Sequence, residues 1–314
     1  MSLLSFTIKR LIGMVLILIG VSIITFALVA YAPGNPIRTN VVQHATPDTI
    51  KMLMHKYGLD LPGYQRYFNY VGGLLHGNLG LSLAQPGVSV NDILASGLPV
   101  SLKLGGVSLL VALLVGIPLG IIAAVRQNRL LADNMNMGAM LILYSIPPFV
   151  LIPILQLIFA IDLHWLPAGQ WGDDGWLGVK EWVMPVTVYA AGLAGFFARS
   201  VRSFMLEVLH QDYIRMARAK GLRERRVVYI HAMKNTLLPF ASVLGPTIAY
   251  LVVGAFIVED LFSIPGIGEI TVQSTLQNDL TVTEATTLVL AVAVVVINAL
   301  TDIFYTLADP RVRL

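Results

Sequence analysis

The side chains best suited to polar chemistry gather in one segment of the chain. Between residues 199 and 234 there are nine Lys or Arg against three Asp or Glu. The basic residues are Arg199, Arg202, Arg215, Arg218, Lys220, Arg223, Arg225, Arg226 and Lys234, and the acidic ones are Glu207, Asp212 and Glu224. At 36 residues, the segment is long for an inert connector. It therefore predicts a docking surface for a cytoplasmic partner, and the alternative is an ordinary positively charged loop.

The sequence contains no pattern typical of catalysis or of metal or nucleotide binding. No Lys is followed by Ser or Thr, so the chain has no phosphate-binding loop of the GxxxxGK[ST] type. Its six His form no HExxH or other close ligand pair, no GxSxG elbow is present, and there is no Cys. We therefore expect no catalytic residue, no metal site and no cofactor in this chain.

The composition is that of a membrane protein. Of 314 residues, 56% are hydrophobic and 12% are charged, whereas soluble proteins carry about 25% charged residues. Mean hydropathy is +0.75. The net charge of +3 is too small to argue for nucleic acid as a partner.

Long runs without charged residues predict six transmembrane helices, because a span needs about 20 apolar residues and only helices satisfy their own backbone in lipid. The fold class is therefore an all-α polytopic membrane protein with a single transmembrane domain, 1–314. The expected spans are about 9–31, 99–125, 135–161, 182–204, 236–258 and 283–307, with an outer loop at 38–98 and a cytoplasmic coupling segment at 205–235.

The distribution of Lys and Arg predicts that both termini are cytoplasmic. With the N-terminus inside, 15 of the 21 Lys and Arg lie in cytoplasmic segments and five in outer loops, with Lys103 at the edge of a span. The first apolar run is too long for the core of a signal peptide, so we expect an uncleaved first helix.

Periodicity within the basic segment predicts helices around a turn. The apolar residues Leu206, Leu209, Tyr213 and Met216 recur at steps of three and four, which indicates a stripe on a helix that continues the fourth span. Gly221 is the expected helix stop. A second helix can restart in the residues that follow it.

The predicted spans are almost free of acidic residues, whereas carriers that couple to ions usually place acids or His inside their spans. We therefore expect the energy for any transport to come from another protein. The alternatives are a stand-alone secondary carrier, which the poverty of buried acids disfavours, and an intramembrane enzyme, for which no catalytic constellation exists.

The motif DYIRMARAKGL (212–222) resembles the coupling-helix region of permeases of binding-protein-dependent ABC importers, and more narrowly their dipeptide/oligopeptide/nickel branch. Arg215 stands where the general motif has Glu, as it does in that branch. Asn35 and Asn78 stand where the branch usually has Asp. The similarity continues through residues 9–36, 57–83, 116–133, 145–149, 165–170, 258–270 and 309–313.

This resemblance implies a type I ABC importer permease fold in a bacterial or archaeal inner membrane. It implies a paralogous permease subunit, two ABC ATPase subunits that hold ATP and Mg, and an extracytoplasmic solute-binding protein, in contact with the lipid bilayer and without nucleic acid. By position, the ATPase contact would be made by Asp212, Tyr213, Arg215, Ala217, Arg218, Ala219, Gly221, Leu222 and Arg223.

For the cargo and the residues that line its path, the sequence offers several candidates. The resemblance implies di- or oligopeptides first, with nickel chelates, glutathione or another small solute as alternatives. Candidates for lining the pathway are Tyr144, Gln156, Tyr189, Tyr250 and Asn298, each of which can instead make a helix–helix hydrogen bond. Candidates for an outer gate or a contact with the binding protein are Glu259, Asp260, Pro265 and Gly266.

Overall fold

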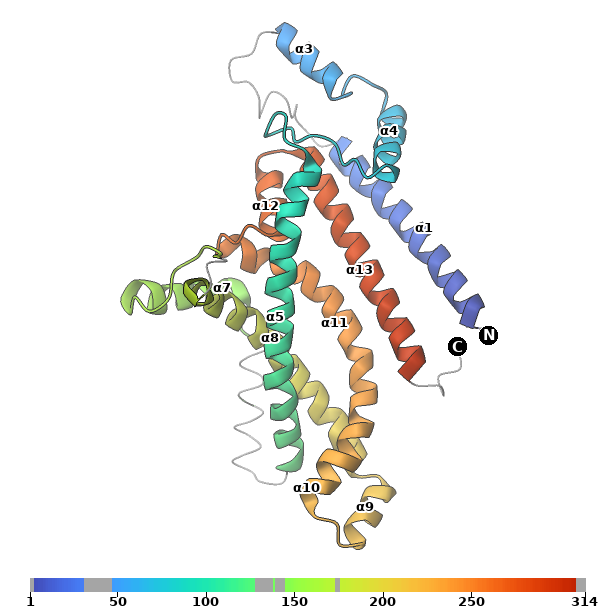
Figure 1. Ribbon diagram of the computed structural model, residues 1–314, viewed down its shortest axis with the longest axis vertical. Coiled ribbons are helices and arrows are strands. Elements are labelled where there is room, and N and C mark those ends of the chain that lie inside the picture. The colour runs from blue at the N-terminus through green and yellow to red at the C-terminus, as the bar shows by residue number, and fades with distance from the viewer. Residues whose placement is uncertain (1–2, 31–46, 128–137, 139–144, 173–175, 309–314) are drawn as a thin grey trace. The chain divides into compact units, whose positions relative to one another are not determined.

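The computed structural model describes residues 3–30, 47–127, 138, 145–172 and 176–308 (Figure 1). Within these residues the regular structure is helical, and the only β feature is an isolated bridge between Leu81 and Ser89. The chain divides by its contacts into two compact units, and the single transmembrane domain 1–314 stays a prediction. The first unit lies within Met1–Leu102 and Ser263–Val296, and the second within Lys103–Phe262 and Ile297–Arg313.

The first unit is built on a small apolar core between the start of one long helix and the start of another. Val90 and Leu94 pack with Ile267, Val282 and Ala285. The helices that contribute to this unit are α1 (Leu3–Ala30), α3 (Pro47–Lys56), α4 (Gly63–Leu75), the beginning of α5 (Val90–Val125), α12 (Ile267–Leu276) and the beginning of α13 (Leu280–Ala308). A Cβ added at Gly97 of α5 would lie 2.4 Å from the Ile270 side chain, so glycine is what allows α5 and α12 to approach.

The second unit is built around close packing of long helices. Its elements are α7 (Pro148–Leu155), the π-helix η1 (Gln156–Asp162), α8 (Trp176–Leu209), α9 (Asp212–Ala219), α10 (Glu224–Arg226), the π-helix η2 (Val227–Ala232) and α11 (Met233–Leu261). Gly116 and Gly120 of α5 lie one helical turn apart, and a Cβ on either would come within 2.7 Å of a backbone oxygen of α8. The rings of Phe197 in α8 and Phe240 in α11 meet edge to face at 5.4 Å. Small residues thus let these helices pack closely, as is common in membranes.

Among the described residues, five helices are long and apolar enough to cross a membrane. They lie at Arg10–Ala30, Val90–Val125, Gly178–Leu209, Glu224–Ala249 and Leu280–Thr301. They correspond to five of the six predicted spans. The predicted span 135–161 falls partly outside the described residues, and its described part, Pro148–Asp162, is a shorter apolar helix. The sixth span therefore stays a prediction.

Helix α5 is longer than the span predicted within it. It begins at Val90, so the last nine residues assigned to the outer loop, 90–98, are helical. The charge-free run in this region begins only at Leu104, after Lys103, whereas the helix starts earlier with Asp92 in its first turn, where an acidic residue is favourable. A search for charge-free runs therefore detects the apolar body of a helix and not its polar beginning.

A buried carboxylate joins two distant parts of the first unit. Asp279 is 3% exposed. It accepts hydrogen bonds from the backbone N–H groups of Leu83 (3.0 Å) and Ala84 (3.1 Å) and from the hydroxyl of Ser82. It also accepts a bond from the N–H of Val282 at 3.3 Å, as an N-cap residue of α13 does. One side chain therefore caps the last helix and fastens the loop at 82–84 to it.

Candidate functional site

The basic segment folds into a helical turn centred on Gly221. Helix α9 ends in a Schellman motif, in which the N–H of Gly221 donates to the carbonyl of Arg218 (2.9 Å) and the N–H of Leu222 donates to that of Ala217 (3.3 Å). Gly221 has φ +73°, a conformation that favours glycine. Helix α10 then begins at Glu224. The predicted helix stop at Gly221 is confirmed, and so is the restart of a helix after it.

The predicted apolar stripe is wrong in its register. Helix α8 ends at Leu209 and Gln211 is extended, so α9 is a separate helix and does not continue the fourth span. Ile214 is fully buried, while Tyr213 and Met216 are 41% and 59% exposed. The break restarts the helical period, so the side that packs inward differs from the one that an uninterrupted helix would present. Sequence reasoning missed Ile214 as the residue that anchors α9.

The turn presents an open, mixed surface to solvent. A Cβ built on Gly221 would meet no atom of the described residues within 4 Å. Tyr213 and Met216 provide exposed apolar area on α9, between exposed Asp212, Arg215 and Arg218. Of the nine predicted contact residues, Ala217 is buried and Leu222 is half-buried, and the other seven are exposed. The structure thus brings the predicted residues together around the turn between α9 and α10 (Figure 1), where most of them are exposed.

Ion pairs within the chain brace this turn. Arg218 donates to Glu224 through both Nε (3.2 Å) and Nη2 (2.7 Å), which closes the turn from α9 to α10. Arg215 pairs with Asp212 at 3.4 Å along α9. Because these side chains are exposed, each pair contributes below about 1 kcal/mol to stability. Their effect is geometric, since they orient the guanidinium groups around Gly221.

A further hydrogen bond ties α9 to the start of α11. The Asn235 side chain donates to the Tyr213 hydroxyl at 2.6 Å. Neither Asn235 nor Glu224 stands among the predicted contact residues, because a partner 22 positions away or across a turn leaves no periodic signal in the sequence. These contacts link the position of α9 to that of α11.

Two pathway candidates make hydrogen bonds to backbone carbonyls. The Gln156 amide donates to Ala168 O (2.6 Å) and to Leu261 O (3.2 Å). Tyr189 is 7% exposed and its hydroxyl donates to Leu251 O, which joins α8 to α11. Asn298 is half-buried on α13. Tyr144 and the side chain of Tyr250 lie outside the described residues, and a pathway role for all five stays a prediction.

Replacing Tyr189 by Phe is expected to lower the stability of the permease by about 1 kcal/mol, the usual size of a hydrogen bond between membrane helices. Thermal unfolding in detergent would measure the loss. Tyr229→Phe, at a 57% exposed position, is the matched control and should change little. If Tyr189→Phe instead impaired uptake with unchanged unfolding temperature, the hydroxyl would act on the cargo and not on packing.

The four outer-gate candidates lie at two helix ends. Glu259 and Asp260 are in the last turn of α11, where Glu259 is buried and Asp260 is half-buried. In the other unit, Pro265 is exposed, and Gly266 is buried at the N-cap of α12. The next residue, Ile267, donates its N–H to Ser101 Oγ at 2.8 Å, which fixes this helix end to α5. Their role at a gate stays a prediction.

Comparison with known proteins identifies the family. Residues 116–314 match the family described as the inner membrane component of binding-protein-dependent transport systems, and residues 3–91 match the N-terminal region of such components. The chain belongs to this family. The turn at Gly221 and helices α8 and α11 all lie within the matched region, so the site described above is part of a transport permease.

Relatives cover the whole chain. The oligopeptide transport system permease protein OppB of Escherichia coli K12 is 35% identical over 310 residues, which is 99% of each chain. The dipeptide transport system permease protein DppB of Bacillus subtilis 168 is 36% identical over 310 residues, 98% of each chain. These relatives belong to the branch that the motifs indicate, and they make this chain a multi-pass permease subunit of the inner membrane.

The fold is shared with a solved importer. A chain of the MetNI methionine ABC transporter, in an inward-facing conformation, superimposes with a TM-score of 0.58 at 19% identity, over 69% of this chain and 96% of that one. The predicted type I ABC importer permease fold agrees with this likeness.

Proposed function

We propose that this permease carries di- or oligopeptides across the inner membrane of a bacterium or archaeon. Identity of 35–37% along almost the whole chain to permeases named for oligopeptide and dipeptide transport supports this cargo. Nickel chelates, glutathione and other small solutes are the alternatives within the same class of importer.

The permease works in a complex with four kinds of contact: a paralogous permease subunit, two ABC ATPase subunits, an extracytoplasmic solute-binding protein and the bilayer. ATP and Mg are held by the ATPase subunits, and this chain, which has no phosphate-binding loop, contributes no residue to the hydrolysis. Six spans with both termini in the cytoplasm place the Gly221 turn on the side where ATP is available.

Energy enters the permease at the Gly221 turn. Movement of the ATPase subunits is transmitted to α9 through Tyr213, Met216 and the open glycine, and from α9 to α11 through the bond between Tyr213 and Asn235. The permease then alternates between two packed arrangements as a rigid-body switch. ATP and the loaded binding protein favour one arrangement by their differential affinity for it.

Transport by the reconstituted complex tests this function. Proteoliposomes that contain both permease subunits, the ATPases and the binding protein should take up labelled di- or oligopeptide only when ATP is present with the ATPase subunits. Uptake by this chain without ATPase subunits would identify a secondary carrier. ATP-dependent uptake of a nickel chelate or glutathione in place of peptide would support the assignment as an importer and contradict the proposed peptide cargo.

A further inference from the structure

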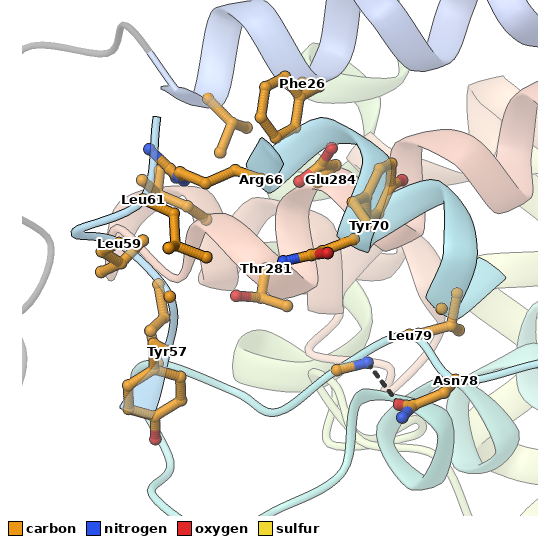
Figure 2. A pocket seen from close by; sticks show the side chains of 17 residues that line it. Phe26, Tyr57, Leu59, Leu61, Arg66, Tyr70, Asn78, Leu79, Thr281 and Glu284 are labelled. Carbon is orange, nitrogen blue, oxygen red and sulfur yellow. Dashed lines mark hydrogen bonds between the residues drawn. The ribbon is translucent and has the colours of Figure 1, made fainter. Parts of the chain in front are cut away.

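The first unit contains a cavity of about 260 Å³ whose walls carry charged groups of both signs. It is lined by Phe26 of α1, Arg66 and Tyr70 of α4, Glu284 in the second turn of α13, and loop residues around Gly58 and Asn78–Gly80 (Figure 2). The Asn78 side chain accepts a bond from the N–H of Gly80 at 3.0 Å, which holds this part of the wall in shape.

Two polar groups in this cavity have no hydrogen-bond partner within the described residues. Glu284 is 7% exposed, and its Oε1 atom is buried and unpartnered. The Tyr70 hydroxyl is also buried and unpartnered. Buried polar groups in folded proteins nearly always have a partner, and leaving one unmade costs about 1–3 kcal/mol, with more for a charged group. The cavity therefore lacks a donor that would satisfy Glu284.

Arg66 lines the same cavity, but its guanidinium does not donate a hydrogen bond to the unpartnered Oε1 atom of Glu284. The guanidinium of Arg66 lies over the ring of Phe26, with 5.8 Å from Cζ to the ring centroid. Burial, and then the nearby Glu284 carboxylate, raise the pKa of the Tyr70 hydroxyl above its usual range, so Tyr70 remains a neutral donor and acceptor. The cavity thus offers a guanidinium, a buried carboxyl group and a neutral hydroxyl to a ligand that carries both charges.

The cavity lies at the level expected for lipid headgroups. Phe26 is four residues from the end of the apolar helix Arg10–Ala30, and Glu284 is four residues, about 6 Å, from the beginning of the helix Leu280–Thr301. Both ends are those predicted to face outward. Tyr67 and Tyr70 lie here as well, and tyrosines are typical of the membrane–water interface.

We propose that this cavity binds the headgroup of an aminophospholipid, with the phosphate against Arg66 and the primary ammonium against Glu284 and Tyr70. Arginine binds phosphate oxygens through two parallel hydrogen bonds, and an ammonium supplies the donors that the carboxylate lacks. At about 30 Å³ per water, the cavity has room for roughly eight or nine waters, enough for a phosphoethanolamine group. A peptide zwitterion carries the same two charges, but the cavity lies at the ends of two apolar helices long enough to span the membrane, at the level of the lipid headgroups.

Lipid retention in native mass spectrometry tests the proposal. The permease, purified with its partner subunits, would be reconstituted into two kinds of nanodisc. One contains phosphatidylethanolamine with phosphatidylglycerol, and the other phosphatidylcholine with phosphatidylglycerol. The complex would then be released from the nanodisc in the mass spectrometer, and the lipids that stay bound to it would be identified by mass. Because the choline ammonium has no N–H, we expect about tenfold greater retention of phosphatidylethanolamine, the effect of one charge-assisted hydrogen bond.

Variants locate the effect. Glu284→Gln and Tyr70→Phe keep the shape of the side chain and are expected to bring the retention ratio towards one, while Arg66→Gln should weaken retention of both lipids. Asp92→Asn and Lys51→Gln, at exposed positions outside the cavity, are the matched controls and should leave the ratio unchanged.

Three results would overturn the proposal. The first is equal retention of the two lipids by the unmodified protein. The second is a preference for phosphatidylethanolamine that both Glu284→Gln and Tyr70→Phe leave intact. The third is displacement of bound lipid by a dipeptide, which would make the cavity a subsite for the cargo.

Discussion

Gly221→Asp is expected to abolish ATP-driven uptake and to leave the permease assembled with its partners in the membrane. Asp adopts the left-handed conformation at φ +73° more readily than most residues, so the cost to the fold is about 1 kcal/mol. A Cβ added there meets no atom within 4 Å among the residues that the structure describes. Loss of uptake would therefore come from bulk and charge placed against the ATPase subunit. Uptake and ATPase activity in proteoliposomes, together with co-purification of the subunits, would measure it.

Two further variants separate the contributions at this turn. Gly77 also has positive φ (+70°) and open space around it, so Gly77→Asp imposes the same backbone demand in the predicted outer loop and should retain uptake. Gly221→Asn tests bulk without charge and should reduce uptake as well. Normal uptake by Gly221→Asp, with the complex intact, would show that the turn does not contact the ATPase.

Asp279→Ala is expected to destabilise the first unit by about 3–5 kcal/mol. The substitution leaves the buried N–H groups of Leu83 and Ala84 without an acceptor and removes the cap of α13. Thermal unfolding in detergent would measure the loss. Hydrogen exchange would show whether the amides of Leu83 and Ala84 lose protection while those in the middle of α8 keep it.

The exposed Asp92 in the first turn of α5 is the matched control, and its replacement by Ala should cost below about 1 kcal/mol. Asp279→Asn retains one acceptor oxygen and should fall between the two. If the amides of residues 83 and 84 stayed protected in Asp279→Ala, the carboxylate would not be what fastens this loop.

The sequence predicts features that depend on neighbours within one helix. Charge-free runs identify five long helices, because burying a charge in lipid is costly wherever it occurs. Gly221 is predictable as a helix stop, because only glycine takes its conformation without strain. The order of the motifs along the chain predicts the family, since many weak signals in the right order are together specific.

Features that depend on distant residues were not predictable. Ile214 becomes the buried anchor of α9 because the helix breaks before Gln211 and a new helix, which packs against η2, starts at Asp212. In the sequence Asp279 cannot be distinguished from other loop carboxylates, because the Ser82, Leu83 and Ala84 groups that it binds lie 195–197 positions away. Glu284 interrupts an apolar run by a single residue, and its burial beside Tyr70 appears only when α4 and α13 are placed together.

The anchorage of the loop by Asp279 has a consequence for synthesis of the chain. The backbone donors at 83 and 84 leave the ribosome 195–196 residues before the carboxylate that accepts from them. At about 5–20 residues per second, this is a wait of roughly 10 to 40 s. The amphipathic helices α3 and α4 are complete long before the loop that follows them can close. The loop at 82–84 is thus translated early but can be fastened only late, and a chain that terminates before residue 279 leaves it open.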